Sequence, residues 1–254
     1  MSIYVGTNEI KNVYVGTTPV KEIFVWTTKV RPSGWQPWAN TIAYYPLTAQ
    51  DTTSDKSWNG HTLTKYGSWT TTFWNYSWVS CLYIDNDAMF YSTIPNTSAS
   101  NGITQSIWYY QVNAPQYDNW WLQTFNAYSP INNEARYIST CIMNWLWNKY
   151  WFTWWISNGS DATTSTVSVT SGWHNVITTF SWNTITLYVD WNKIGTTGRN
   201  LSFNTQTYIN ISRRTSSYNR SIRGYVSNAI FENKARTAQE VTDYYNLTKW
   251  NYWL

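Results

Sequence analysis

The segment Ser171–Gly198 constrains the fold of this chain more than any other part of the sequence. It reads SGWHNVITTFSWNTITLYVDWNKIGTTG, and both Trp173–Phe180 and Thr184–Val189 are rich in β-branched and aromatic residues. Polar and apolar residues alternate in the second of these runs, as in an antiparallel strand with one buried face. A tight turn at Asp190–Asn192 leads into a third run, Lys193–Thr197. The segment therefore predicts three consecutive strands.

The composition agrees with a predominantly β fold. Of the 254 residues 19% are aromatic and only 12% charged. Residues that favour strands are abundant, whereas Ala, Glu, Lys and Leu are sparse. The length allows one large β-sandwich with a small appendage, or two small domains. The net charge of +4 is thinly spread, and we expect no nucleic-acid partner because the densest basic region is too narrow: Arg213, Arg214, Arg220 and Arg223.

Other parts of the chain also read as strands, and one reads as a helix. Runs on either side of the Asp85–Asp87 turn predict strands at Val79–Ile84 and Ala88–Ile94, and alternation predicts a strand at Thr163–Thr170. Near the C-terminus, Thr237 is a suitable helix N-cap with Glu240 three residues later. The chain is therefore expected to be all-β with one short C-terminal helix.

Several of these segments resemble, in chain order, the motifs of laminin-G-like (concanavalin A-like) lectin jelly rolls. The motifs are AYYPL at Ala43–Leu47, the strand Ile103–Tyr110, the GWH…LYVD hairpin of residues 172–190, and the strand Ile222–Phe231 with the helix that follows it. The resemblance covers about residues 41–248. It implies a two-sheet antiparallel jelly-roll sandwich, of the kind found in bacteriophage tail and virion surface proteins.

The first 32 residues contain a repeat with a period of ten. Ile3–Ile10, Val13–Val20 and Ile23–Val30 each read as a short strand, a turn and another short strand. Three such units are too short to bury a core. We expect them to pair with one another, with other copies of the chain or with other virion proteins. Residues 33–40 then form a linker, and residues 41–254 form the jelly roll.

Tryptophan occupies several positions where a turn favours glycine. Trp26 aligns with two glycines of the repeat, and Trp58, Trp182 and Trp191 stand in turns that need a positive φ. The chain has 20 Trp and 11 Gly, an inversion of the usual order. We hypothesise that the gene uses UGA as a glycine codon, so that these four residues are glycine in the native organism. A tryptophan-rich binding surface is the alternative.

The sequence shows neither a signal peptide nor an apolar run long enough for a membrane span. We therefore expect synthesis and folding in a cytoplasm. Cys81 and Cys141 are too few for a disulfide framework, and two buried thiols are favoured over a single bridge.

The sequence offers little for catalysis. A glycoside hydrolase needs a close pair of carboxylates, and the nearest such pair, Glu240 and Asp243, lies on the predicted helix. His61 lies in or beside a loop, and His174 matches a position that is structural in the resembled family. We expect no enzymatic activity.

Two kinds of ligand site remain. Many domains of the resembled fold hold Ca²⁺ at the rim, for which Asp85 and Asp87 with Asn86 are the first candidates and Asp51 and Asp55 the next, unless these residues simply favour turns. Aromatic and amide side chains of the fold could bind sugar: Tyr109, Tyr110, Tyr117, Asn119, Arg136 and Tyr137.

These features together favour a non-enzymatic virion surface or tail-associated protein with a lectin-like module for cell-surface or glycan attachment. A purely architectural virion protein is the main alternative. A cellular, extracellular adhesin and a glycoside hydrolase are the less favoured ones.

Overall fold

The computed structural model divides the chain into two compact units, Met1–Gln36 and Pro37–Leu254. The structure describes six short segments before residue 31, and after it residues 40–49, 51, 53–57, 59–66, 72–76, 79–84, 89–97, 102–111, 121–129, 137–146, 149–157, 162–168, 170–181, 184–198, 206–212, 222, 224–252 and 254.

The described part of the first unit consists of three antiparallel hairpins, which repeat one register at intervals of ten residues. The pairs are Tyr4 with Glu9, Tyr14 with Pro19 and Phe24 with Lys29. The strands are β1 (Tyr4–Val5), β2 (Asn8–Glu9), β3 (Tyr14–Val15), β4 (Thr18–Pro19), β5 (Ile23–Val25) and β6 (Thr28–Val30). The register thus recurs with the ten-residue period of the sequence.

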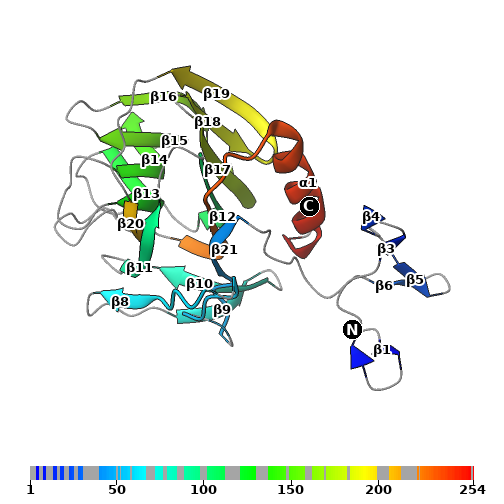
Figure 1. The fold of residues 1–254 in the computed structure, drawn as a ribbon. Coiled ribbons are helices and arrows are strands. Elements are labelled where there is room, and N and C mark those ends of the chain that lie inside the picture. The colour runs from blue at the N-terminus through cyan, green and yellow to red at the C-terminus, as the bar shows by residue number, and fades with distance from the viewer. Residues whose placement is uncertain are drawn as a thin grey trace. The chain divides into compact units, whose positions relative to one another are not determined.

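The second unit is a sandwich of two antiparallel sheets (Figure 1). In the described residues, the first sheet runs β19-β18-β17-β12-β21-β10-β9, and β7 also pairs with β21. These strands are β7 (Thr41–Tyr45), β9 (Thr72–Tyr76), β10 (Val79–Ile84), β12 (Ile103–Gln111), β17 (Trp173–Ser181), β18 (Thr184–Val189), β19 (Asn192–Gly198) and β21 (Gly224–Glu232).

The second sheet runs β16-β15-β14-β13-β20-β11-β8 in the described residues. Its strands are β8 (Thr64–Tyr66), β11 (Met89–Thr97), β13 (Trp121–Ser129), β14 (Tyr137–Leu146), β15 (Lys149–Ser157), β16 (Ala162–Ser168) and β20 (Gln206–Ile211). The expected all-β jelly-roll sandwich is confirmed, and the strands predicted at Val79–Ile84 and Thr184–Val189 are observed with those bounds.

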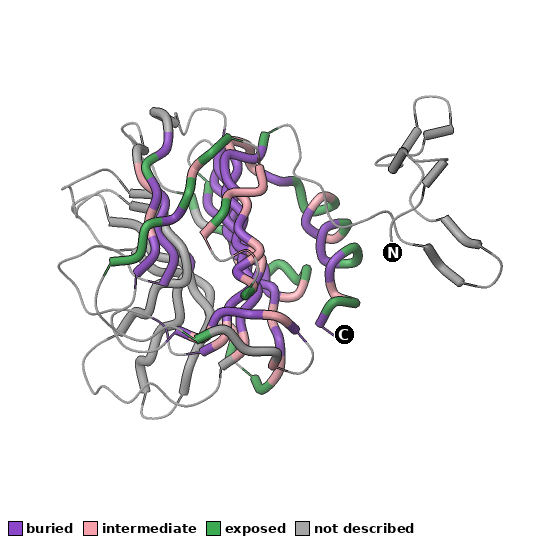
Figure 2. Tube along the Cα trace, turned by 90° about the horizontal axis from the view of Figure 1, so that it is seen from below, coloured by how far each residue is buried: buried purple, intermediate pink, exposed green. Residues whose placement is uncertain are grey.

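The main core lies between the two sheets. Ile107, Val176 and Val226 of the first sheet belong to the same buried cluster as Phe90 and Ile209 of the second. Alternation along β12 turns Ile107 and Tyr109 into this core and Trp108 and Tyr110 to the opposite face. Buried residues follow the strands of the first sheet through the middle of the unit (Figure 2).

The C-terminal segment covers part of the outer face of the first sheet (Figure 1). It comprises helix α1 (Ala238–Thr248) and the 3-10 helix η2 (Lys249–Tyr252). Tyr252 stacks on Trp108 with ring centroids 3.8 Å apart, and Tyr245 lies 5.7 Å from the same ring. Burial of these large rings against β12 fixes the segment on the sheet.

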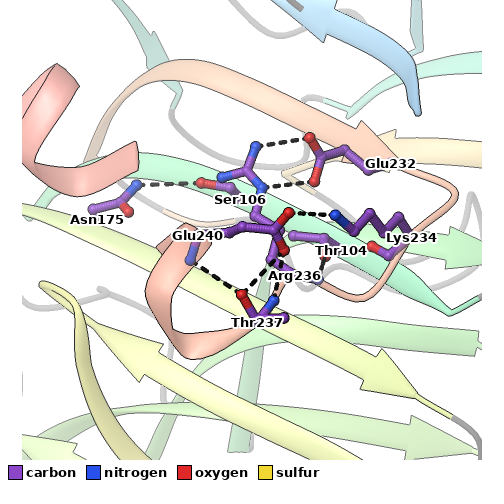
Figure 3. A network of polar contacts seen from close by, with 8 residues as sticks. All are labelled: Thr104, Ser106, Asn175, Glu232, Lys234, Arg236, Thr237 and Glu240. Atoms are coloured by element: carbon purple, nitrogen blue, oxygen red, sulfur yellow. Dashed lines mark hydrogen bonds and ion pairs between the residues drawn. The ribbon is translucent and has the colours of Figure 1, made fainter. Parts of the chain in front are cut away.

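A buried ion pair holds the start of this segment (Figure 3). The Arg236 guanidinium donates to both carboxylate oxygens of Glu232, at 2.7 and 2.8 Å, and both side chains are almost fully buried. The Thr104 hydroxyl on β12 donates to the carbonyl of Lys234 and accepts from the amide of Arg236. These contacts join β12, β21 and the helix start. No helix in the described part of the chain is long and apolar enough to cross a membrane.

Candidate functional site

A cluster of half-buried tyrosines lies on the outer face of the first sheet. Register places Tyr83 of β10 opposite Tyr225 of β21, and Tyr225 opposite Tyr110 of β12. The line continues to Trp173 of β17, which is opposite Tyr110. Directly opposed residues of neighbouring strands share a face. Four strands from distant parts of the sequence thus bring their aromatic residues into one line across the sheet.

Tyr76 of β9 completes this tyrosine cluster, defined here as Tyr76, Tyr83, Tyr110 and Tyr225. The Tyr76 ring stacks on that of Tyr225, with centroids 4.4 Å apart and planes inclined by 16°. It also lies 4.7 Å from the Tyr110 ring, and the Tyr76 and Tyr110 hydroxyls are hydrogen-bonded at 3.3 Å. All four side chains are partly exposed to solvent. The cluster therefore presents both ring surface and hydroxyl groups.

Gly224 allows β21 to approach β12 closely beside the cluster. A Cβ at this position would lie 2.4 Å from the carbonyl oxygen of Tyr110 and 2.7 Å from a ring carbon of Tyr109. Real side chains do not make contacts this short. Glycine at 224 is therefore what permits the register that sets Tyr225 against Tyr110.

The cluster is electrically neutral over the ordinary pH range. The hydrogen bond with Tyr76 raises the pKa of Tyr110, and burial raises the pKa of Tyr225. Cys81 lies fully buried on the same face of the sheet, and burial raises the pKa of its thiol to about 11. The described groups of this face thus offer neutral donors and acceptors. Cys81 is a buried thiol, as the sequence predicted, and forms no disulfide.

The C-terminal segment closes one end of the line. Trp173 is only 3% exposed, because it packs against Tyr110 and against Tyr252 of η2. The centroid of its ring lies 5.8 Å from that of Tyr110 and 5.1 Å from that of Tyr252. The other end reaches Thr72 of the edge strand β9, which is opposite Tyr83 and exposed. The accessible part of the line therefore runs from Tyr110 toward the β9 edge.

One of the predicted sugar-binding residues belongs to this cluster, namely Tyr110. Tyr109 does not, because its ring is 1% exposed and lies in the core between the sheets. Tyr137 begins β14, where its side chain is outside the described structure. Tyr117, Asn119 and Arg136 also lie outside the described residues.

Asp55, a predicted candidate for Ca²⁺, organises a loop. Its carboxylate accepts four hydrogen bonds: from the backbone amides of Tyr44, Ser57 and His61 and from the Ser57 hydroxyl, at 2.8–3.0 Å. A carboxylate has about four acceptor positions, so these four donors occupy the acceptor positions of Asp55. Asp51 pairs with Lys56 at 2.5 Å. The first candidates, Asp85 and Asp87, lie outside the described residues, among which no cluster of potential metal ligands is found.

The histidine of the central hairpin has a structural setting. His174 Nδ1 lies 2.6 Å from Asp190 Oδ2, and the other oxygen of Asp190 accepts from the amide of Asn175. This pair ties the start of β17 to the turn after β18, as expected for a structural histidine. Glu240 caps helix α1, and Asp243 accepts from Gln239 on the same helix. Both acids thus serve the helix.

Sequence patterns did not indicate Tyr76, Tyr83 and Tyr225. Each sits in an ordinary aromatic strand pattern. The register sets Tyr83 opposite Tyr225, and ring stacking adds Tyr76. The available signal was face alternation in the predicted strands: Tyr83 and Tyr225 fall on the outward parity of β10 and β21.

Comparisons with solved structures support the fold. Domain 4 of AbnA, a GH43 extracellular arabinanase from Geobacillus stearothermophilus in complex with arabinotriose, has a TM-score of 0.63 at 15% identity, over 80% of this chain and 97% of that one. The binding domain of botulinum neurotoxin serotype D/C VPI 5993 gives 0.59 at 13% identity, over 82% of this chain and 52% of that one.

The binding domain of botulinum neurotoxin DC in complex with SialylT is similar to the same extent, with a TM-score of 0.58 at 14% identity, over 82% of this chain and 51% of that one. The chain thus spans about half the length of the toxin binding domains that it matches. No protein-family model and no curated protein sequence matches the chain. At these identities the likeness establishes the β-sandwich fold.

Proposed function

We propose that this protein is a non-enzymatic attachment protein whose β-sandwich binds a glycan at the tyrosine cluster. The observation that carries the proposal is the partly exposed cluster itself, in which four tyrosines from four strands present rings and hydroxyls on one sheet face. Sugar rings have apolar faces that stack on aromatic rings, and their hydroxyls pair with neutral donors and acceptors.

The structural neighbours favour this ligand class. One similar domain was solved with arabinotriose and another with SialylT. The arabinanase domain is matched over 97% of its length and the toxin binding domains over about half of theirs. The arabinanase domain is therefore the neighbour that supports a saccharide ligand for a sandwich of this kind, and the tyrosine cluster is the surface of this chain best suited to one.

We place the protein on the surface of a virion, bound to other virion proteins or to copies of itself through the three N-terminal hairpins. Two-stranded hairpins are marginally stable by themselves, so a role in assembly accounts for their strict repetition. A purely architectural virion protein is the second candidate, and the same hairpins favour it. Mass spectrometry of purified particles from the native source tests the location.

Glycan binding is tested by placing the full-length protein on an array of neutral and charged glycans. We expect retention on at least one glycan, reduced in Tyr83→Ala and lost in Tyr225→Ala. The control is Tyr66→Ala, which removes a 45% exposed tyrosine from β8 of the other sheet. A folded protein that binds no glycan would refute the attachment function, and release of reducing ends from a bound glycan would refute the non-enzymatic assignment.

We further propose that Trp26, Trp58, Trp182 and Trp191 are glycine in the native organism, through decoding of UGA as glycine. The support comes from Trp191, which has a φ of +65°. Trp26, Trp58 and Trp182 lie outside the described residues. Peptide mass spectrometry of the native protein tests the idea, and tryptophan found at position 191 refutes it.

A further inference from the structure

The tyrosine cluster has a direction. Tyr83, Tyr225 and Tyr110 are directly opposed on three adjacent strands, so the line that they form crosses the strands. Centroids of neighbouring rings lie 5.1 Å apart for Tyr83 and Tyr225 and 6.4 Å apart for Tyr225 and Tyr110. These spacings follow from the distance between strands and are close to the repeat of successive pyranose rings in an extended 1,4-linked chain.

The cluster also offers a definite number of positions for sugar rings. Tyr83 gives the first and Tyr110 the last, while Tyr225 and Tyr76 together form the middle as a two-ring stack. The line stops after Tyr110, because the next ring, Trp173, is covered by Tyr252. Three ring positions are therefore available.

Charge decides between classes of glycan. The cluster consists of tyrosines only, and the described side chains beside it on the same face are uncharged as well: Thr72, Cys81 and Ser227. A carboxylated sugar needs an arginine or lysine to replace the water that it loses. Neutral hydroxyls satisfy the hydroxyls of an uncharged sugar.

We infer that the ligand of the tyrosine cluster is an uncharged 1,4-linked glycan that lies across the strands and places three consecutive sugar rings on Tyr83, the Tyr76–Tyr225 stack and Tyr110. This inference rests on the proposed glycan-binding function and specifies its ligand. Because Trp173 and η2 bound the line beyond Tyr110, a fourth ring gains no stacking contact at that end.

Calorimetric titration of the full-length protein tests the inference with three sets of probes: cello-oligosaccharides and chito-oligosaccharides from two to five rings, and oligogalacturonides of the same lengths. For at least one neutral series, affinity should rise about tenfold from two rings to three, the gain of one further stacking contact. It should then level off. The oligogalacturonides should bind at least about tenfold more weakly, and added salt should leave the neutral affinities unchanged.

Variants locate the binding. Tyr83→Ala should lower the affinity for three rings to that for two and leave two-ring binding nearly unchanged, since a disaccharide can occupy the remaining positions. Tyr83→Phe, which keeps the ring, should retain most of the affinity, and Tyr66→Ala on the other sheet should behave as the unmodified protein. Circular dichroism establishes that each variant is folded.

The results separate the inference from the function on which it rests. A charged glycan that binds the cluster while both neutral series fail would overturn the inference and leave the attachment function standing. Three-ring affinity that is unchanged in Tyr83→Ala or in Tyr225→Ala, or neutral binding that gains nothing beyond two rings, would also overturn the inference. A protein that binds no probe and no array glycan would overturn both.

Discussion

At the scale of single residues, Trp191 shows how the backbone constrains side-chain choice. Asp190 and Trp191 form the two-residue turn between β18 and β19, and their φ angles are +50° and +65°. A hairpin turn of this length favours positive φ at both positions because that twist matches the flanking strands. Aspartate tolerates the conformation, whereas tryptophan is strained by roughly 1–2 kcal/mol. Trp191 also contacts Tyr245, with ring centroids 4.5 Å apart. Backbone strain at this position therefore opposes the stabilising contact between the two rings.

Comparing glycine with alanine at position 191 separates the strain from the ring contact. Trp191→Gly and Trp191→Ala both lose the contact with Tyr245, but only alanine keeps the Cβ at a φ of +65°. The glycine variant should therefore be more stable than the alanine variant by about 1 kcal/mol, although glycine normally costs stability in ordered structure. Urea unfolding measures the difference. Equal stability, or greater stability with alanine, would contradict a strained turn.

At the scale of elements, helix α1 depends on its N-cap residue, Thr237. The Thr237 hydroxyl accepts from the Glu240 amide at 3.2 Å, while the Glu240 carboxylate accepts from the Thr237 amide at 2.9 Å. This capping box pairs two amides that the helix leaves open. Burial acts to raise the pKa of Glu240, but the hydrogen bonds from Lys234 and Thr237 outweigh it and lower the pKa below its ordinary value of 4.5.

Removing the cap should destabilise the sandwich, because the helix covers Trp108. Thr237→Ala is expected to lower the free energy of unfolding by about 1 kcal/mol, whereas Asn246→Ala, at an exposed position within the same helix, should change it by less than about 0.5 kcal/mol. Since the folded-state pKa of Glu240 is depressed, its contribution is present above pH 4.5 and is lost as the pH falls through the folded-state value. Glu240→Gln should flatten that loss in urea unfolding series, and a loss of the same size in this variant would contradict the assignment.

The elements were predictable from local sequence, but the site was not. β-branched and aromatic runs predicted β10, β17 and β18, and the capping pattern predicted the start of α1, because propensity and capping act over a few residues. The cluster depends on pairing between β10, β12 and β21, which are far apart in the chain. Tyr109 and Tyr110 illustrate the limit: the sequence marked both as sugar-binding candidates, and a single step along the strand buries one and exposes the other.

At the scale of the whole molecule, buried tyrosines make the folded state less stable at high pH. Burial raises the pKa values of Tyr244 and Tyr245 from 10.0 to about 12. It also raises the pKa values of Tyr44, Tyr45 and Tyr252. A raised folded-state pKa means that the stabilisation is complete below pH 10 and is lost as the pH rises toward the folded-state value.

The free energy of unfolding should therefore fall between pH 10 and pH 12, by about 1 kcal/mol per pH unit for each of these tyrosines. Urea unfolding at several alkaline pH values measures the slope. Tyr244→Phe removes one titrating group and should reduce the slope, whatever it does to stability at neutral pH. A slope that is the same in both proteins would show that Tyr244 ionises as easily in the folded state as in the unfolded one.

The division of the chain into two units predicts that the sandwich is independent of the N-terminal hairpins. Among the described residues, both buried clusters consist of residues from Ile42 onward, and residues 37–254 form a compact unit by themselves. The segment 37–254 should unfold in one cooperative step, with a midpoint within about 3 °C of the full-length value, a difference of less than about 1 kcal/mol.

If the hairpins assemble copies of the chain, the full-length protein should show the larger mass in light scattering and the shortened one the mass of a monomer. A large fall in the midpoint at equal mass would mean that the hairpins stabilise the sandwich of their own chain, and would contradict their proposed role in assembly.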